Sequence, residues 1–173
     1  PSFRRQGFAL RGERVATGQA PGQGAAMLFS GGVDSTSSLI EHRDVVQDLV
    51  TVWGADVPVA DDVLWQQLYE RVTGGELTRG RRLAVVQSNM KDVVDGLRLT
   101  RRFADDFHGY HWWGTVQHGL ALTSLVIPLC AHDGRDTVYV ASAGSALADP
   151  EPWGSSPAVD NLVRWSSGRV VHD

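Results

Sequence analysis

A glycine turn in the first third of the chain combines groups that can bind a polyphosphate and a metal ion. Its residues are Phe29, Ser30, Gly31, Gly32, Val33, Asp34, Ser35 and Thr36. The glycines permit a tight turn that brings backbone N–H groups close to phosphate oxygens, and the hydroxyl side chains add donors. A helix that begins here would direct its positive end at the same anion. Bare phosphate would repel Asp34, so this carboxylate predicts a Mg²⁺ ion between protein and nucleotide.

Residues 30–35 have the sequence S-G-G-V-D-S. This pattern resembles the S-G-G-x-D-S signature of the PP-loop (N-type) ATP pyrophosphatases. The chain has no G-x-x-x-x-G-K-[ST] motif and no lysine in the turn, so the resemblance implies cleavage between the α- and β-phosphates of ATP. It also implies that Asp34 and Ser35 take part in catalysis with ATP and Mg²⁺. A glycine turn whose serines only cap a helix is the structural alternative.

The segment 53–58, which follows the second predicted strand, offers a place for the adenosine. Gly54 permits the close approach of a flat base, and Asp56 can meet a ribose hydroxyl or an amine. In the PP-loop superfamily the segment after the second strand lies along the adenosine, so the resemblance implies the same position here. An ordinary strand-to-helix turn with an aspartate cap is the alternative.

Aromatic and polar residues gather where a long apolar helix is predicted to begin. Trp113, Thr115, His118 and Gly119 lie within two helical turns and can form the floor of a substrate pocket. Gly119 costs the helix about 1 kcal/mol relative to alanine, which indicates a packing or close-approach reason for it. A lone histidine in an apolar helix is, alternatively, a hydrogen-bonded core residue.

Two loops after the fourth predicted strand offer further hydroxyl and backbone N–H groups at the expected ligand edge. The candidate substrate-binding residues there are Ser142, Ser145, Trp153, Gly154, Ser155 and Asp160. The W-G-S-x-P pattern with an acid three residues later, together with H-G at the head of the preceding helix, resembles a bacterial PP-loop subgroup. That subgroup includes the UDP-N-acetylmuramoyl-L-alanyl-L-glutamate epimerases. Ser156 stands where a histidine is expected after the W-G-S triplet.

This resemblance implies an enzyme that uses ATP to adenylate a small-molecule or peptide carboxylate and releases pyrophosphate. The activated acyl group would then lose an α-proton to a base such as His118, giving epimerisation, or meet an amine, giving an amide. One alternative is a PP-loop sulfur transferase or base-modifying enzyme, against which the lone Cys130 argues. Another is a catalytically silent nucleotide-binding subunit.

Composition narrows the class of protein. The chain has 173 residues, 42% of them hydrophobic, and a net charge of −4 with scattered basic residues, so nucleic-acid binding is not expected. The longest apolar run, 120–131, is too short to span a membrane, and no signal peptide is visible, so we expect a cytoplasmic protein. A chain that begins with Pro1 is expected to be part of a longer protein, and a further domain or a second copy would be its partner.

The order of apolar segments predicts how these residues are positioned. A glycine-rich arm, residues 1–24, precedes one PP-loop nucleotide-binding domain, residues 25–173. Strands are predicted at 25–29, 49–53, 83–86 and 137–141, with a strand-like 169–172. Helices are predicted at 35–42, at 61–72 with Asp61 as the cap, and at 114–127. Such alternation predicts an α/β fold with a parallel sheet flanked by helices, Rossmann-like, whose ligands bind at the carboxyl ends of the strands. The glycine turn lies at that edge.

Overall fold

The structure is a computed structural model, and it describes residues 24–107, 109–141 and 153–173. The first half alternates strands and helices: β1 (Ala25–Leu28), α1 (Val33–Glu41), β2 (Val46–Trp53), α2 (Asp62–Gly74) and β3 (Arg82–Gln87). The second half contains α3 (Met90–Val93), α4 (Gly96–Arg102), α5 (His118–His132), β4 (Thr137–Val140), α6 (Pro157–Asp160), β5 (Arg164–Trp165) and β6 (Gly168–His172). Most of the predicted arm, residues 1–23, lies outside the described residues.

The described strands form one six-stranded sheet in the order β3-β2-β1-β4-β6-β5. All neighbouring strands are parallel except the short β5, which pairs antiparallel with β6. The predicted α/β, Rossmann-like fold is therefore confirmed. The chain leaves β1 toward β2 on one side and later returns as β4 on the other side. This reversal of strand order opens a crevice at the carboxyl ends of β1 and β4.

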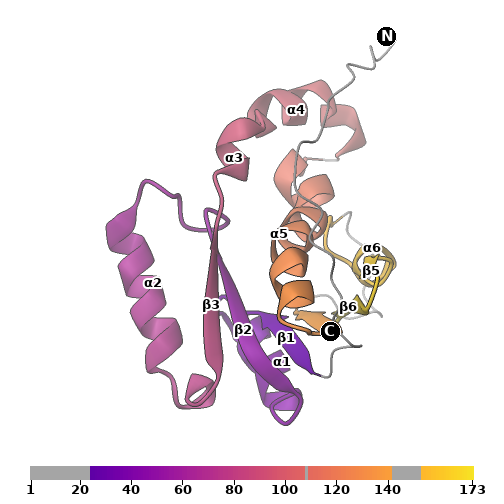
Figure 1. The fold of residues 1–173 in the computed structure, drawn as a ribbon. Coiled ribbons are helices and arrows are strands. Elements are labelled where there is room, and N and C mark those ends of the chain that lie inside the picture. Colours follow the sequence, from indigo (N-terminus) through magenta and orange to yellow (C-terminus); the bar gives the residue numbers. More distant parts are fainter. Residues whose placement is uncertain (1–23, 108, 142–152) are drawn as a thin grey trace.

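Helices cover both faces of the sheet, which explains why the strands are apolar without alternation. Leu39 of α1 and Val72 of α2 pack with Met27 and Leu49 on one face. Val126 of α5 packs with residues of β1, β2, β4 and β6 on the other face. Figure 1 shows α2 and α5 on opposite sides of the strands.

The element boundaries differ from the prediction in ways that have physical reasons. β2 begins at Val46 and not at residue 49. The prediction began the strand too late because Asp48 interrupts the apolar pattern, although this residue is buried within the strand. The long apolar helix opens with a π-helical turn, Trp113–Gln117, and continues past Pro128 to His132. The predicted cap of α2 is confirmed, since the Asp61 side chain accepts a hydrogen bond of 2.9 Å from the Leu64 N–H.

One helix among the described residues, Trp113–His132, is long and apolar enough to cross a membrane by length and composition. In the structure, Val126 and Cys130 of this helix pack against the sheet as part of the core. A core helix passes the same test, so this helix is weak evidence for a membrane span.

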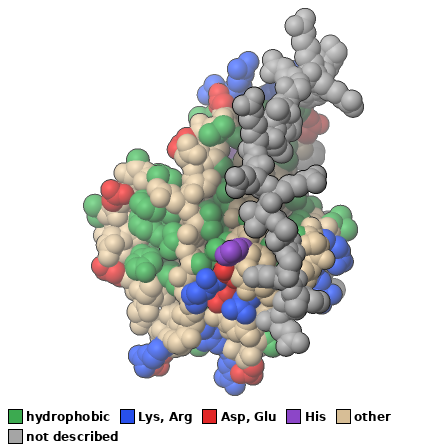
Figure 2. All heavy atoms as spheres, viewed as in Figure 1, with side chains coloured by type: hydrophobic (Ala, Val, Ile, Leu, Met, Phe, Trp, Pro, Cys, Tyr) green, Lys and Arg blue, Asp and Glu red, His purple; other side chains and the backbone are tan. Residues whose placement is uncertain are grey.

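The free edge of the sheet is partly apolar. β3 is the edge strand beside β2, and its Val85 is 39% exposed, while Val63 on α2 is 71% exposed. Figure 2 shows hydrophobic side chains gathered over this part of the molecule, where α2 and β3 lie. The opposite end of the sheet order is closed by the short β5–β6 hairpin.

A buried carboxylate ties the amino-terminal ends of three strands together. Asp48 on β2 accepts hydrogen bonds from Arg135 Nε at 2.7 Å and from Arg82 Nη2 at 2.9 Å, and Arg82 also pairs with Asp133. Burial alone would raise the pKa of Asp48, but the hydrogen bonds from Arg135 and Arg82 hold it below its usual value. The cluster fixes the edge of the sheet that lies away from the glycine turn.

Replacing Asp48 by alanine should destabilise the fold, because Arg82 and Arg135 would lose their shared buried acceptor. We expect a loss of about 3 kcal/mol in the free energy of unfolding, measured by urea denaturation at pH 7. Asp44→Ala is the control, since the Asp44 side chain is 92% exposed, and it should change stability by less than about 0.5 kcal/mol. Equal stabilities of the two variants would contradict this account.

Candidate functional site

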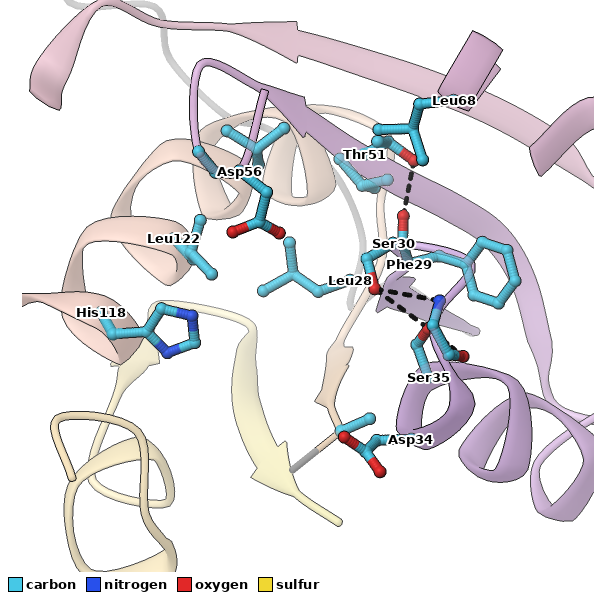
Figure 3. A pocket seen from close by; sticks show the side chains of 15 residues that line it. Leu28, Phe29, Ser30, Asp34, Ser35, Thr51, Asp56, Leu68, His118 and Leu122 are labelled. Atoms are coloured by element: carbon cyan, nitrogen blue, oxygen red, sulfur yellow. Dashed lines mark hydrogen bonds between the residues drawn. The ribbon is translucent and has the colours of Figure 1, made fainter. Parts of the chain in front are cut away.

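A cavity of about 210 Å³ lies at the carboxyl edge of the sheet, in the crevice that the strand order creates. Its walls combine two kinds of side chain. The polar ones come from Ser30, Asp34, Ser35, Thr51, Asp56 and His118, and the apolar ones include Leu28, Val52, Ala55, Leu68 and Leu122. Figure 3 shows His118 and the glycine turn on opposite sides of the cavity, with Leu28 and Asp56 between them.

The glycine turn is held in a shape that leaves the start of α1 open. Gly31 has a φ of 70°, a conformation that favours glycine, and no side chain caps the first turn of α1. Ser35 Oγ donates to the Gly32 carbonyl at 3.2 Å, and Ser30 Oγ accepts from the Gly32 N–H at 3.3 Å. Asp34 is exposed and lines the cavity. A helix N-terminus beside a solvent-accessible carboxylate fits a phosphate group with a bound Mg²⁺.

Three other residues of the turn, Phe29, Val33 and Thr36, are placed differently from Ser30, Asp34 and Ser35. Phe29 lines the cavity, but its side chain is buried among α1 and α2, and its carbonyl accepts a hydrogen bond from Thr51 Oγ1 at 2.6 Å. Val33 is 85% exposed, and neither Val33 nor Thr36 lines the cavity. Thr51 was not predicted, because a threonine inside an apolar strand is an ordinary strand residue.

The two residues predicted after β2 have different surroundings. Asp56 lines the cavity. Gly54 has a φ of 104°, and a Cβ there would lie 1.8 Å from the Ser88 carbonyl oxygen. The close approach at Gly54 is therefore made by the backbone that follows β3, and contact between Gly54 and a base stays a prediction.

The head of α5 presents an imidazole to the cavity between two indole rings. The His118 ring centroid lies 5.4 Å from that of Trp113, edge to face, and 5.5 Å from that of Trp153. His118 Nδ1 and Thr115 Oγ1 are buried and form no hydrogen bond with any residue that the structure describes. Lys91 Nζ lies 4.3 Å from the Trp113 ring centroid. Because π-helical turns occur often at functional sites, an unpaired imidazole here is a candidate for substrate contact.

His118 is held in its neutral form. Burial lowers its pKa, Lys91 lowers it further, and the carboxylates of Asp56 and Asp160 oppose the shift without cancelling it. A neutral imidazole can accept a proton, which is what a general base must do.

The W-G-S segment packs directly on the head of α5 through glycine contacts. The Gly119 N–H donates to the Gly154 carbonyl at 3.1 Å, and the Gly154 N–H donates to the Gly114 carbonyl at 2.6 Å. The buried Asp160 accepts from Ser155 Oγ at 2.6 Å and lies 2.8 Å from His172 Nδ1. The two segments that carry the resemblance therefore lie in contact in the structure. However, Gly119, Gly154, Ser155 and Asp160 form the packed wall behind His118 and do not line the cavity.

Other predicted residues are placed differently. Trp113 and Trp153 flank His118, and Trp153 is 40% exposed. Ser142 and Ser145 lie outside the described residues. Their binding role stays a prediction.

A second cavity, of about 400 Å³, adjoins the first and shares Ser30, Gly32, Asp56 and Leu68 with it. Its remaining walls come from Val57 and from the face of α2 that carries Leu68: Leu64, Gln67 and Arg71. The sequence did not predict that this face of α2 lines a cavity, because polar residues on an amphipathic helix are typical of a solvent-exposed surface.

Comparisons with models of protein families, with curated proteins and with solved structures each found no match to this chain. The geometry of the site and the S-G-G-x-D-S motif are therefore the basis for assigning a function.

Gly119→Ala tests the close packing of the W-G-S segment on α5. The added Cβ would lie 2.4 Å from Asp160 Oδ1 and 2.6 Å from the Gly154 carbonyl oxygen. We expect a loss of roughly 2–3 kcal/mol in the free energy of unfolding, measured by urea denaturation. Gly96→Ala is the matched control, because a Cβ there meets nothing within 4 Å. A G119A protein as stable as G96A would show that this contact is not made.

The neutral imidazole of His118 predicts a pH dependence of stability. The pKa of His118 in the folded protein lies below the ordinary value of 6.5. As the pH falls, this imidazole is therefore protonated in the unfolded chain at a higher pH than in the folded protein. The stabilisation is therefore complete above about pH 7 and is lost progressively as the pH falls through about 6.5. Urea denaturation between pH 8 and pH 5.5 should show a steeper loss for the wild-type protein than for His118→Gln. Parallel curves would contradict the assignment.

Proposed function

We propose that this protein is a PP-loop ATP pyrophosphatase that adenylates a carboxylate substrate and releases pyrophosphate. The observation that supports this most is the cavity at the reversal of strand order, which joins the S-G-G-x-D-S turn to a neutral histidine. The turn offers anion-binding groups at one side, and His118 offers a proton acceptor at the other.

The cavity walls match the parts of a nucleotide. The backbone of residues 31–35, at the open start of α1, would hold the phosphates. Apolar side chains such as Leu28, Val52 and Leu122 would pack on the purine, with Asp56 near the ribose or the base amine. Asp34 and the phosphate oxygens are the hard oxygen ligands that Mg²⁺ prefers.

The reaction follows from this arrangement. A carboxylate oxygen of the substrate forms a bond to the α-phosphorus, and the bond from that phosphorus to the oxygen of the β-phosphate breaks. The products are an acyl-adenylate and pyrophosphate. Backbone N–H groups of the turn stabilise the charge that accumulates on the departing pyrophosphate. When bound, Mg²⁺ supplies further neutralisation of that charge.

The second step uses the acyl group that adenylation has activated. Adenylation makes the α-proton of the substrate more acidic, and the neutral His118 that lines the cavity would remove it. This favours epimerisation, which the resemblance to the muramoyl-peptide epimerases also implies. A proton then returns to the opposite face of the α-carbon, and attack of water on the acyl carbon restores the carboxylate and releases AMP. Attack by an amine on the same acyl carbon would give an amide instead. Deuterium uptake at the α-carbon in D₂O distinguishes epimerisation from amide formation.

Sulfur transfer has less support. Cys130 is buried in the core, and burial raises the pKa of its thiol to about 11. A thiol in this state is a poor nucleophile and cannot relay sulfur. A silent nucleotide-binding subunit is a weaker alternative, since both Asp34 and Ser35 line the cavity.

Asp34→Asn should lower pyrophosphate release from ATP by at least about 100-fold, because the carboxylate that would hold Mg²⁺ is lost. The assay uses the longest chain that can be prepared, with Mg²⁺ and a panel of amino acids, peptides and muramoyl peptides. Asp62→Asn is the matched control, because Asp62 is also an exposed acid in the first turn of a helix but lines neither cavity.

The assignment predicts pyrophosphate without free phosphate in the wild-type protein and full activity in D62N. A folded D34N protein with wild-type turnover would contradict it.

A further inference from the structure

An arginine on α2 stands beside the glycine turn, in the second cavity. Arg71 lines this cavity together with Ser30 and Gly32 of the turn. Its Nε lies 3.8 Å from the position that a Cβ on Gly31 would occupy. The guanidinium group is therefore next to the backbone that would hold the phosphates.

The geometry of α2 fixes this placement. Leu64, Gln67, Leu68 and Arg71 recur at spacings of three and four residues, so they lie on one face of the helix. The neighbouring Val72 is buried against the sheet, and its Cγ2 lies 3.2 Å from the Cβ position of Gly31. Packing of Val72 thus keeps the last turns of α2 against the glycine turn.

Arg71 forms no hydrogen bond or ion pair with any residue that the structure describes. A cation in the last turn of a helix stabilises that helix through its dipole, which is a structural role for Arg71. That role does not require the guanidinium group to line a cavity beside the turn.

Apart from Arg71, the charged side chains among the described residues that line the two cavities are all negative. Asp34 and Asp56 contribute carboxylates, and His118 is neutral. Arg71 is the only lysine or arginine among the described residues that line either cavity. ATP brings further negative charge, of which one Mg²⁺ ion neutralises only a part. A planar guanidinium group pairs with two phosphate oxygens at once, which a single ammonium group does less well.

We propose that Arg71 binds the pyrophosphate part of ATP and stabilises it as the leaving group. This inference rests on the proposed adenylation, and it assigns the second cavity to the product pyrophosphate rather than to the acyl substrate. Arg71 acts as the bond between the α-phosphorus and the bridging oxygen breaks, because the electron pair of that bond stays on the departing pyrophosphate. Arg71 acts through charge and hydrogen bonds, and no proton is transferred to or from it.

The test measures dissociation constants for inorganic pyrophosphate, ATP and adenosine in the presence of Mg²⁺, by titration calorimetry or NMR. Arg71→Gln should raise the dissociation constants for pyrophosphate and for ATP by roughly 10-fold or more, because charge-assisted hydrogen bonds are lost. Adenosine, which has no phosphate, should bind R71Q and the wild-type protein equally. Arg71→Lys should give intermediate values for pyrophosphate, since it keeps the charge but loses the paired geometry.

Arg101→Gln is the matched control, because Arg101 is exposed on α4 and lines neither cavity. It should bind all three ligands as the wild-type protein does. Since Arg71 is exposed, R71Q should keep its stability to within about 0.5 kcal/mol, which urea denaturation checks.

Unchanged pyrophosphate affinity in folded R71Q would overturn the role of Arg71 while leaving the proposed adenylation intact. An equal loss of adenosine affinity would also overturn it, because the substitution would then act on the whole site. Arg71-dependent pyrophosphate binding in a wild-type protein that never releases pyrophosphate from ATP would keep the Arg71 assignment and refute adenylation. A wild-type protein that binds neither pyrophosphate nor ATP would refute both.

Discussion

The candidate site depends on the parallel pairing of β1 with both of its neighbours. Leu28 at the carboxyl end of β1 pairs with Val50 of β2 on one side and with Val140 of β4 on the other. Parallel strands end at the same edge, so the segments that follow them must come together there. Since β2 lies beside β1 on one side of this pair and β6 lies beside β4 on the other, the strand order reverses between β1 and β4 and leaves a crevice there. The glycine turn and the head of α5 face each other across this opening.

Electrostatics divides the edge into two parts with different chemistry. Around the glycine turn, Asp34 and the start of α1 line the first cavity and Arg71 of α2 lines the second, so this part of the edge is polar and suits phosphates and a metal ion. On the α5 side, burial lowers the pKa of His118 and keeps its imidazole neutral, and the rings of Trp113 and Trp153 pack on it without lining the cavity. Adenylation followed by epimerisation would use both regions, because negative charge develops on the departing pyrophosphate and removal of the α-proton requires a neutral base.

The sequence predicted the layered fold and the glycine turn well, because apolar periodicity and turn residues are local signals. The Asp61 cap of α2 is an example of such a local signal that the structure confirms. Contacts between distant segments were predicted only in part. The sequence indicated a packing or close-approach reason for Gly119, but only the fold shows that Asp160 and the Gly154 carbonyl lie against it. Arg71 was missed, because nothing in an amphipathic helix indicates which neighbour its polar face meets.

The most direct test of adenylation traces an oxygen atom from the substrate carboxylate to AMP. The substrate carboxylate is labelled with ¹⁸O and incubated with ATP, Mg²⁺ and the protein, and the AMP formed is analysed by mass spectrometry. Adenylation joins a carboxylate oxygen to the α-phosphorus, and later attack at the acyl carbon leaves that oxygen on AMP. We therefore predict AMP that contains one ¹⁸O atom, with an equal amount of pyrophosphate. Unlabelled AMP, or ADP with free phosphate, would contradict the proposed adenylation.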